Sequence, residues 1–133
     1  MEIENKWEEY SKRFEEKERE VLHRSPIFFE RCQWIECGYG WLDPIDRLAI
    51  EIEKLSEINM KLDRRFSGHR AVQIKQKFGG LRVYMERSDE KVDNLIKVAE
   101  DVCAETCETC GGAGKLRNGG WITVKCDACM EAK

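Results

Sequence analysis

Four cysteines near the C-terminal end constrain the fold of this chain more than any other feature. They form two C-x2-C pairs separated by fifteen residues: Cys107, Cys110, Cys126 and Cys129. Each pair can bend into a knuckle that presents two thiolates to one ion, and tetrahedral Zn²⁺ binds four cysteine sulfurs at about 2.3 Å. The spacing therefore predicts that these four side chains bind Zn²⁺.

The residues between the two pairs have the composition of a small β-hairpin. Glycines follow the first pair, and two runs suited to short strands, residues 115–117 and 121–125, flank the turn sequence Asn118-Gly119-Gly120. Residues 107–133 are therefore expected to form a zinc-ribbon module. So short a segment cannot build a core alone, so the metal would supply its folding energy. Four protein ligands would close the site, which makes the expected role of the ion structural.

Two other uses of these cysteines remain open. A redox dithiol would need one C-x-x-C beside a βαβ unit, which two pairs flanking a hairpin do not resemble. An iron–sulfur cluster would use the same four thiolates. A disulfide framework is disfavoured for two reasons. The number of cysteines, seven, is odd, and residues 1–6 lack the apolar core of a secretion signal. We therefore expect a cytoplasmic protein without a membrane segment.

Helical periodicity dominates the preceding part of the chain, which we expect to form a body over residues 1–106. A charged helix over residues 2–22 would end at Ser25-Pro26, because proline disfavours helix in the residue before it. The clearest amphipathic helix starts near Asp43-Pro44, with Asp43 as its N-cap, and runs to about Leu62. Residues 27–36 are rich in large apolar side chains and could be a buried helix or a strand.

The hydrophobic period changes from helical to alternating within residues 71–86. Apolar residues there alternate with polar ones on both sides of Gly79-Gly80, which predicts an antiparallel hairpin with the paired glycines in its turn. The positions expected to face the core are Val72, Ile74, Leu81 and Val83. A last helix is expected over residues 89–105, with this buried face: Val92, Leu95, Ile96, Val98, Ala99 and Val102. The predicted fold class is α+β, with a helical body, a hairpin and a C-terminal zinc ribbon.

The hairpin is the best candidate for a binding surface. Residues 61–87 hold eight bases and two acids, whereas the chain as a whole has a net charge of −3. If the apolar positions face the core, the opposite face is cationic with one aromatic member, and it could bind a phosphate, a nucleotide or a nucleic-acid strand. The candidate binding residues are Arg70, Lys75, Lys77, Arg82 and Tyr84. The alternative is a solvated face whose cations pair with acids of the N-terminal helices.

The remaining cysteines and histidines give no catalytic signature. Cys32, Cys37 and Cys103 each lie beside apolar residues and are expected to be buried, although Cys103 could be a rival metal ligand. The chain has two histidines, and neither lies in a recognisable catalytic motif; His69 is expected at the surface. We therefore predict no catalytic residues and a protein that is not an enzyme.

Three segments together resemble a family of small uncharacterised proteins encoded by bacteriophages and prophages. The segments are Glu36-Cys37-Gly38-Tyr39-Gly40-Trp41, the stretch from Gln73 to Tyr84 with Lys77-Phe78-Gly79-Gly80 at its centre, and the two cysteine pairs with the Gly114-Lys115-Leu116-Arg117 and Gly120-Trp121 between them. The resemblance covers roughly residues 36–129. It implies a phage accessory protein in a bacterial cytoplasm and no specific chemistry.

The functional expectation follows from a closed metal site, a small size and this resemblance. We expect a non-catalytic protein that binds and inhibits a host protein, within a defence system. One alternative is a protein that sequesters a nucleotide signal on its basic hairpin. Another is a nucleic-acid-binding protein that uses ribbon and hairpin together, which the acidic net charge disfavours. The sequence leaves the oligomeric state open, with a homo-oligomer as one alternative.

Overall fold

The computed structural model describes residues 2–131 and has the predicted α+β fold. Its elements in chain order are α1 Glu2–Arg24, the 3₁₀ turn η1 Tyr39–Trp41, α2 Leu42–Leu62, β1 Ala71–Lys77, β2 Gly80–Met85, α3 Glu90–Cys103, β3 Lys115–Arg117, β4 Thr123–Lys125 and α4 Asp127–Glu131. The strands form two separate two-stranded antiparallel sheets, β1-β2 and β3-β4. Within these residues, none of the helices combines the length and the apolar character that crossing a bilayer requires.

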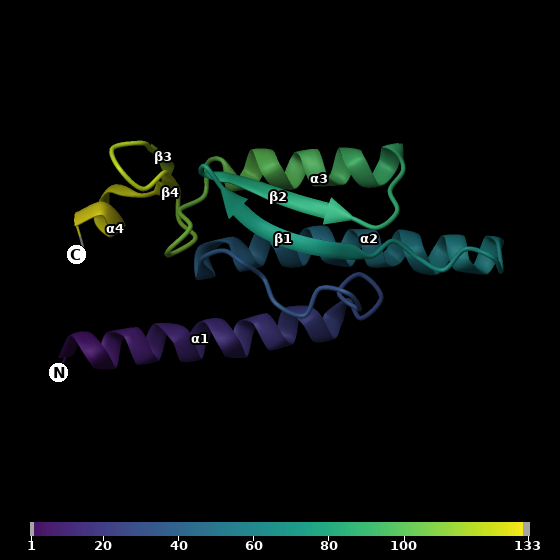
Figure 1. Ribbon diagram of the computed structural model, residues 1–133, viewed down its shortest axis with the longest axis horizontal. Helices are drawn as coiled ribbons and strands as arrows, with labels where there is room; N and C mark the ends of the chain where they lie inside the picture. Colours follow the sequence, from purple (N-terminus) through teal and green to yellow (C-terminus); the bar gives the residue numbers. More distant parts are fainter. Residues whose placement is uncertain (1, 132–133) are drawn as a thin grey trace.

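One hydrophobic core lies between the β1-β2 hairpin and the helices α2 and α3. Figure 1 shows α3, the hairpin and α2 side by side, with α1 on the far side of α2 and the small β3-β4 sheet at one end. The helix α2 contributes the buried residues Leu42, Ile45, Leu48, Ala49 and Ile52 at helical spacing. Trp41, Phe28 and Phe29 complete the interior, where each is essentially inaccessible to solvent. The core therefore draws on every part of the body, including the segment between α1 and α2.

The β1-β2 hairpin turns at Phe78-Gly79 and not at the two glycines. Lys77 pairs with Gly80, and the two residues between them have positive φ values of 53° for Phe78 and 80° for Gly79. Two successive positive φ angles in a two-residue loop are the geometry of a type I′ turn, which matches the twist of the flanking strands. Gly80 is part of β2. A bulky side chain at φ 53° is an outlier, since the left-handed region crowds its Cβ.

The segment before α2 is neither the helix nor the strand that residues 27–36 suggested. Residues 27–31 are turn, and the last residue, Glu36, makes a single bridge to β1: its N–H donates to Ile74 O at 2.9 Å and its carbonyl accepts from Gln76 N at 3.0 Å. Glu53 of α2 accepts hydrogen bonds from the N–H groups of Ile27 and Phe28 and so fixes the start of this segment. Hydrogen bonds to α2 and β1 therefore hold this segment in place, and regular secondary structure does not.

The sequence expectations about which apolar residues are buried are wrong in two elements. On α3 the core stripe consists of Val92, Ile96, Ala99 and Cys103, whereas Val98 is 61% exposed and Val102 is also exposed. On β1, an irregularity between Ala71 and Gln73 moves Val72 out of the core and puts Ala71 in it. In α3 and in β1, more residues are apolar than the neighbouring elements can cover, so some apolar side chains remain exposed.

The start of α2 differs from the prediction as well. Trp41 occupies the N-cap position, because the turn η1 continues directly into the helix, and Asp43 lies in the first helical turn. The Asp43 carboxylate forms an ion pair with Lys17 of α1 at 2.7 Å, and the Asp46 carboxylate forms one with Arg24 at 2.8 Å. The two carboxylates therefore join α2 to α1 instead of capping a helix.

Candidate metal centre

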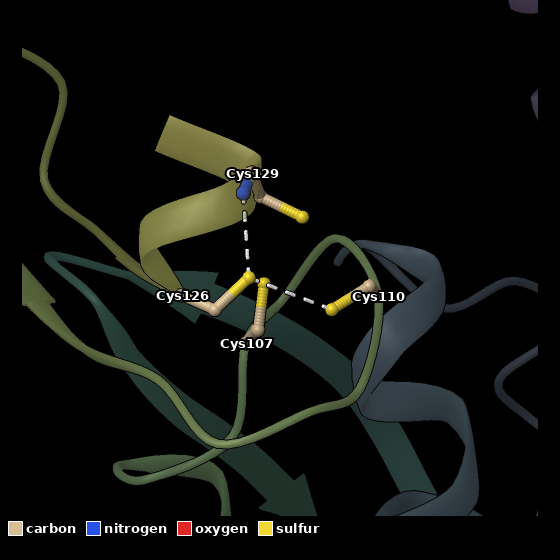
Figure 2. A group of neighbouring side chains, drawn as sticks. All are labelled: Cys107, Cys110, Cys126 and Cys129. Atoms are coloured by element: carbon tan, nitrogen blue, oxygen red, sulfur yellow. Dashed lines mark hydrogen bonds between the residues drawn. The ribbon is translucent and has the colours of Figure 1, made fainter. Parts of the chain in front are cut away.

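The four cysteines of the two C-x2-C pairs converge on one point. Their Sγ atoms all lie within 4.8 Å of one another, and Cys110 Sγ and Cys126 Sγ are 3.7 Å apart (Figure 2). Four sulfurs arranged tetrahedrally at about 2.3 Å from one ion would be about 3.8 Å apart. All seven cysteines are free thiols. The geometry and the chemistry of the donors therefore fit a four-coordinate metal ion, and this group could hold one.

Each knuckle is shaped by backbone hydrogen bonds that aim N–H groups at sulfur. Gly112 N lies 3.4 Å from Cys110 Sγ, and Cys129 N lies 3.3 Å from Cys126 Sγ. In the second pair, the helix α4 begins directly after Cys126, and its first turn brings Cys129 back over that residue (Figure 2). These contacts stabilise sulfur in its thiolate form, which is the form that binds metals.

The electrostatics of the four thiols are uneven. Burial raises the pKa of Cys107, but hydrogen bonds from the backbone N–H groups of Cys110 and Cys126 outweigh burial and lower it to about 6. Burial and the neighbouring sulfurs raise the pKa of Cys129. One sulfur is thus prepared as a thiolate by the fold, while Cys129 needs a cation to become one.

The β3-β4 sheet carries the second knuckle. Leu116 pairs with Val124, and Arg117 pairs with Thr123. The Arg117 guanidinium donates to the Lys125 carbonyl at 3.1 Å and to the Asp127 carboxylate at 2.7 Å, which ties β4 to the start of α4. The hairpin expected between the two cysteine pairs is therefore present, although the second strand is shorter than residues 121–125.

Glu108, inside the first knuckle, joins the metal centre to the body. Its carboxylate accepts hydrogen bonds from the backbone N–H of Gly38 at 2.9 Å, from Gln76 Nε2 at 3.1 Å and from Thr123 Oγ1 at 2.8 Å. Its backbone carbonyl accepts the N–H of Gly40 at 2.7 Å. A single residue thus connects the loop before α2, the strand β1 and the strand β4. Glu108 is not among the candidate residues predicted from the sequence, where its position between Cys107 and Cys110 is the one signal that points to it.

Two glycines before α2 allow this close approach. A Cβ on Gly40 would lie 2.0 Å from the Cys107 carbonyl oxygen, and a Cβ on Gly38 would lie 2.4 Å from the Glu108 carbonyl oxygen. The adjacent Trp41 donates its indole N–H to the Thr106 carbonyl at 2.8 Å. Side chains at either glycine would push the first knuckle away from the body, so both positions require glycine.

The turn of the first hairpin packs against the ribbon in the same way. A Cβ on Gly79 would lie 2.5 Å from Leu116 Cδ1, a terminal methyl carbon of β3. The glycine motif before α2, the glycine motif of the hairpin and the two cysteine pairs therefore meet in one junction. The C-terminal module is docked on the body through all three.

No family model, curated protein or solved structure matches this chain. The metal centre is therefore defined by its own geometry.

The structure brings four of the five candidate binding residues to one face of the hairpin. Lys75 pairs directly with Arg82, Gln73 pairs with Tyr84, and Lys77 follows at the next position along the same face. Arg70 lies before β1, at the end of the hairpin away from the turn, and its guanidinium pairs with Glu30 at 2.8 Å. We name the surface formed by Gln73, Lys75, Lys77, Arg82 and Tyr84 the outer face of the hairpin.

The cations of the outer face are not paired with acids. Among the described side chains, no carboxylate makes a salt bridge with Lys75, Lys77 or Arg82. Lys75 Nζ instead lies 5.7 Å from the centre of the Tyr84 ring. Asp43 and Asp46 of α2 pair with Lys17 and Arg24 of α1, and Glu53 accepts backbone N–H groups, so these acids do not neutralise this surface.

The other cysteines and the histidine have structural positions. Cys32 and Cys103 are buried in the core, and burial raises the pKa of Cys103 to about 12. Burial also raises the pKa of Cys37, which packs against the core. The cluster of four sulfurs does not include Cys103. His69 is 2% exposed and not at the surface, because its ring packs against Phe66 with 4.8 Å between the ring centres.

Exposed apolar side chains gather where the two hairpins meet. Trp121 is 84% exposed and Phe78 is 70% exposed, and Leu116 of β3 is also largely exposed. A groove of about 320 Å³ lies between the hairpin turn and the ribbon, lined by Gln76, Lys77, Phe78, Gly120, Trp121 and Ile122. We call this surface the tip groove. Trp121 was expected in a strand, but β4 begins at Thr123.

Proposed function

We propose that the four cysteines bind one structural Zn²⁺ ion. The support is the sulfur spacing given above, together with the preference of Zn²⁺ for four thiolates in closed tetrahedral sites. With four protein ligands the ion has no open position for water or substrate. Its role is to hold the two knuckles together and so to keep Glu108 in place against Gly38 and Gly40.

We further propose that the chain is a non-catalytic binding protein of bacteriophage origin that binds and inhibits a host protein of a defence system. The resemblance of residues 36–129 to phage and prophage proteins supports the origin. The closed metal site supports binding rather than catalysis, as do the positions of the histidines: His69 is buried and His23 is exposed on α1.

The single observation that carries this proposal is the tip groove. Trp121 and Phe78 are far apart in the sequence, and both present most of their surface to solvent. Phe78 also adopts φ 53°, where asparagine or glycine is strongly preferred in this type of turn. A large apolar side chain that is both strained and exposed lowers stability without contributing to the core, which is a common property of functional sites. Exposed aromatic side chains beside a groove are typical of the centre of a protein interface.

The test is capture of a partner from a lysate of the bacterial host, followed by reconstitution with the purified partner. Wild-type protein and Trp34→Ala, which removes a tryptophan that is 67% exposed in another part of the chain, should recover the same protein. Trp121→Ala should lose it, and the purified partner should lose its activity when wild-type protein is added. Equal recovery by Trp121→Ala, or no partner in any lysate, contradicts the proposal.

A further inference from the structure

Two like charges lie directly opposite each other on the outer face of the hairpin. Lys75 and Arg82 are cross-strand partners in the antiparallel register, so their side chains leave the sheet on the same side. Like charges directly opposite each other destabilise a sheet. Lys77, one position further along the same face, adds a third cation. The sequence thus maintains an arrangement that weakens the hairpin unless an anion lies over it.

The fold keeps this surface open. The opposite face of the hairpin, with Ile74 and Leu81, is buried against the helices. Glu36 bridges to Lys75 at the edge of β1. Its carboxylate accepts a hydrogen bond from Gln73 Nε2 at 3.0 Å and makes no salt bridge with Lys75. Figure 1 shows no helix of residues 2–131 crossing the free side of the hairpin. Lys77 and Arg82 are exposed and Lys75 is half-buried, so the cations lie at the surface.

An aromatic ring lies at each end of the row of cations. Tyr84 is exposed at one end, and Phe78 in the turn is at the other. Lys75 lies over the first ring and Lys77 lies 5.8 Å from the centre of the second. Alternating cations and exposed rings are how proteins bind single strands: the cations contact phosphates and the rings stack on bases. A surface that bound only phosphate would not need the rings.

The length of the row selects a strand over a single nucleotide. Tyr84 is four residues from Gly80 along β2, which corresponds to about 13 Å at the usual rise of a strand. A stacked nucleic-acid strand advances about 3.4 Å per nucleotide. The row therefore spans about four nucleotides.

We propose that the outer face of the hairpin binds single-stranded nucleic acid, with Lys75, Lys77 and Arg82 on phosphates and Tyr84 stacked on a base. This site goes beyond the proposed host-protein contact at the tip groove. It shares Lys77 and Phe78 with the tip groove but needs neither Trp121 nor a host protein, so the Trp121→Ala variant separates the two proposals.

The experiment measures fluorescence anisotropy of a labelled 12-nucleotide oligo(dT) with the zinc-loaded protein between 50 and 300 mM salt. Three phosphate contacts predict a slope of log K against log salt of about −2, because each contact on a single strand contributes about −0.7. The double variant Lys75→Gln/Arg82→Gln should reduce the slope to about −0.7 and weaken binding about 50-fold at 50 mM salt.

The control variant Lys12→Gln/Arg19→Gln removes the same two charges from exposed positions of α1 and should bind as wild type does. Tyr84→Ala should weaken binding and leave the salt slope unchanged, because it removes stacking and no charge. Trp121→Ala should bind oligo(dT) normally.

Four results would overturn the proposal. They are absence of binding at 50 mM salt, equal losses in the two double variants, tighter binding of a 12-base-pair duplex than of the single strand, and binding of dTMP as tight as that of the oligomer. Loss of the captured host protein in Lys75→Gln/Arg82→Gln, without oligonucleotide binding by wild type, would assign the outer face to the protein partner instead.

Discussion

The carboxylate of Glu108 accepts a hydrogen bond of 2.9 Å from the backbone N–H of Gly38, seventy residues earlier in the chain. Glu108 lies between two cysteines of the metal-binding group, and Gly38 lies in the loop that leads into α2. The four-cysteine cluster is therefore connected to the body as well as to its own short segment. Loss of a bound ion should therefore weaken the hydrogen bond that Gly38 donates to Glu108.

Removing the metal should release the ribbon from the body. With a chelator present, amide hydrogen exchange should accelerate at Gly40 and Glu108, whose N–H groups bond to Glu108 O and Val124 O. Amides in the middle of α2 should stay protected, since they belong to a core that excludes the ribbon's cysteines. Uniform loss of protection would show instead that the metal is needed for the whole fold.

Replacing Gly40 by alanine should lower the free energy of unfolding by about 2–3 kcal/mol, as overpacking of a tight interior contact does. The new Cβ would lie 2.0 Å from the Cys107 carbonyl oxygen. Gly119→Ala is the matched control, because no atom lies within 4 Å of the position of its Cβ. Urea denaturation should place the control within about 0.5 kcal/mol of wild type; equal stability of both variants would mean that the knuckle does not pack as described.

Glu108→Ala should lower the free energy of unfolding by about 1–3 kcal/mol, because it leaves the N–H of Gly38 and the side chains of Gln76 and Thr123 without an acceptor. Urea denaturation of the metal-loaded protein gives the value. Glu105→Ala changes an exposed acid of the same region and is the control. If the two variants unfold alike, Glu108 does not join the ribbon to the body.

Phe78→Asn should raise the free energy of unfolding by about 0.5–1 kcal/mol. Asparagine tolerates the positive φ of 53° and is the preferred residue at this turn position. The same variant should recover less of the host protein, because it removes one wall of the tip groove. A variant that is both less stable and fully able to bind would refute the strained, functional role given to Phe78.

Cys103→Ala should leave the metal content unchanged, whereas Cys126→Ser should abolish tight binding. Cys103 is buried in the core and is not part of the four-sulfur group. Metal analysis after desalting distinguishes the two variants. A matching loss of metal in Cys103→Ala would make it the rival ligand that its place in the sequence allowed.

Local patterns were sufficient to predict the helices α1, α2 and α3 and the two hairpins, but not the structure of residues 27–36 or the short helix α4. The helical period of α2, the alternation in β1 and β2, and the spacing of the cysteine pairs each depend on neighbours in the sequence. His69 was predicted at the surface and is buried, whereas Val98 was predicted in the core and is exposed. Both predictions were wrong because burial depends on which surfaces a distant element covers. The role of Asp43 was also wrong, since Lys17 of another helix determines it.

The convergence of the four cysteines was predictable for the same reason, and the junction around them was not. Gly38 and Gly40 appear in the sequence as a break in the chain. Their requirement for close contact with Cys107 and Glu108 arises only when segments about seventy residues apart come together. A single sequence contains no signal for such a contact.

X-ray absorption spectroscopy at the zinc edge, together with metal analysis of freshly purified, reduced protein, tests the central claim most directly. The account predicts one zinc per chain, with four sulfur neighbours at about 2.3 Å and no oxygen or nitrogen neighbour. Protein without bound metal, or zinc with fewer than four sulfur ligands, would contradict it.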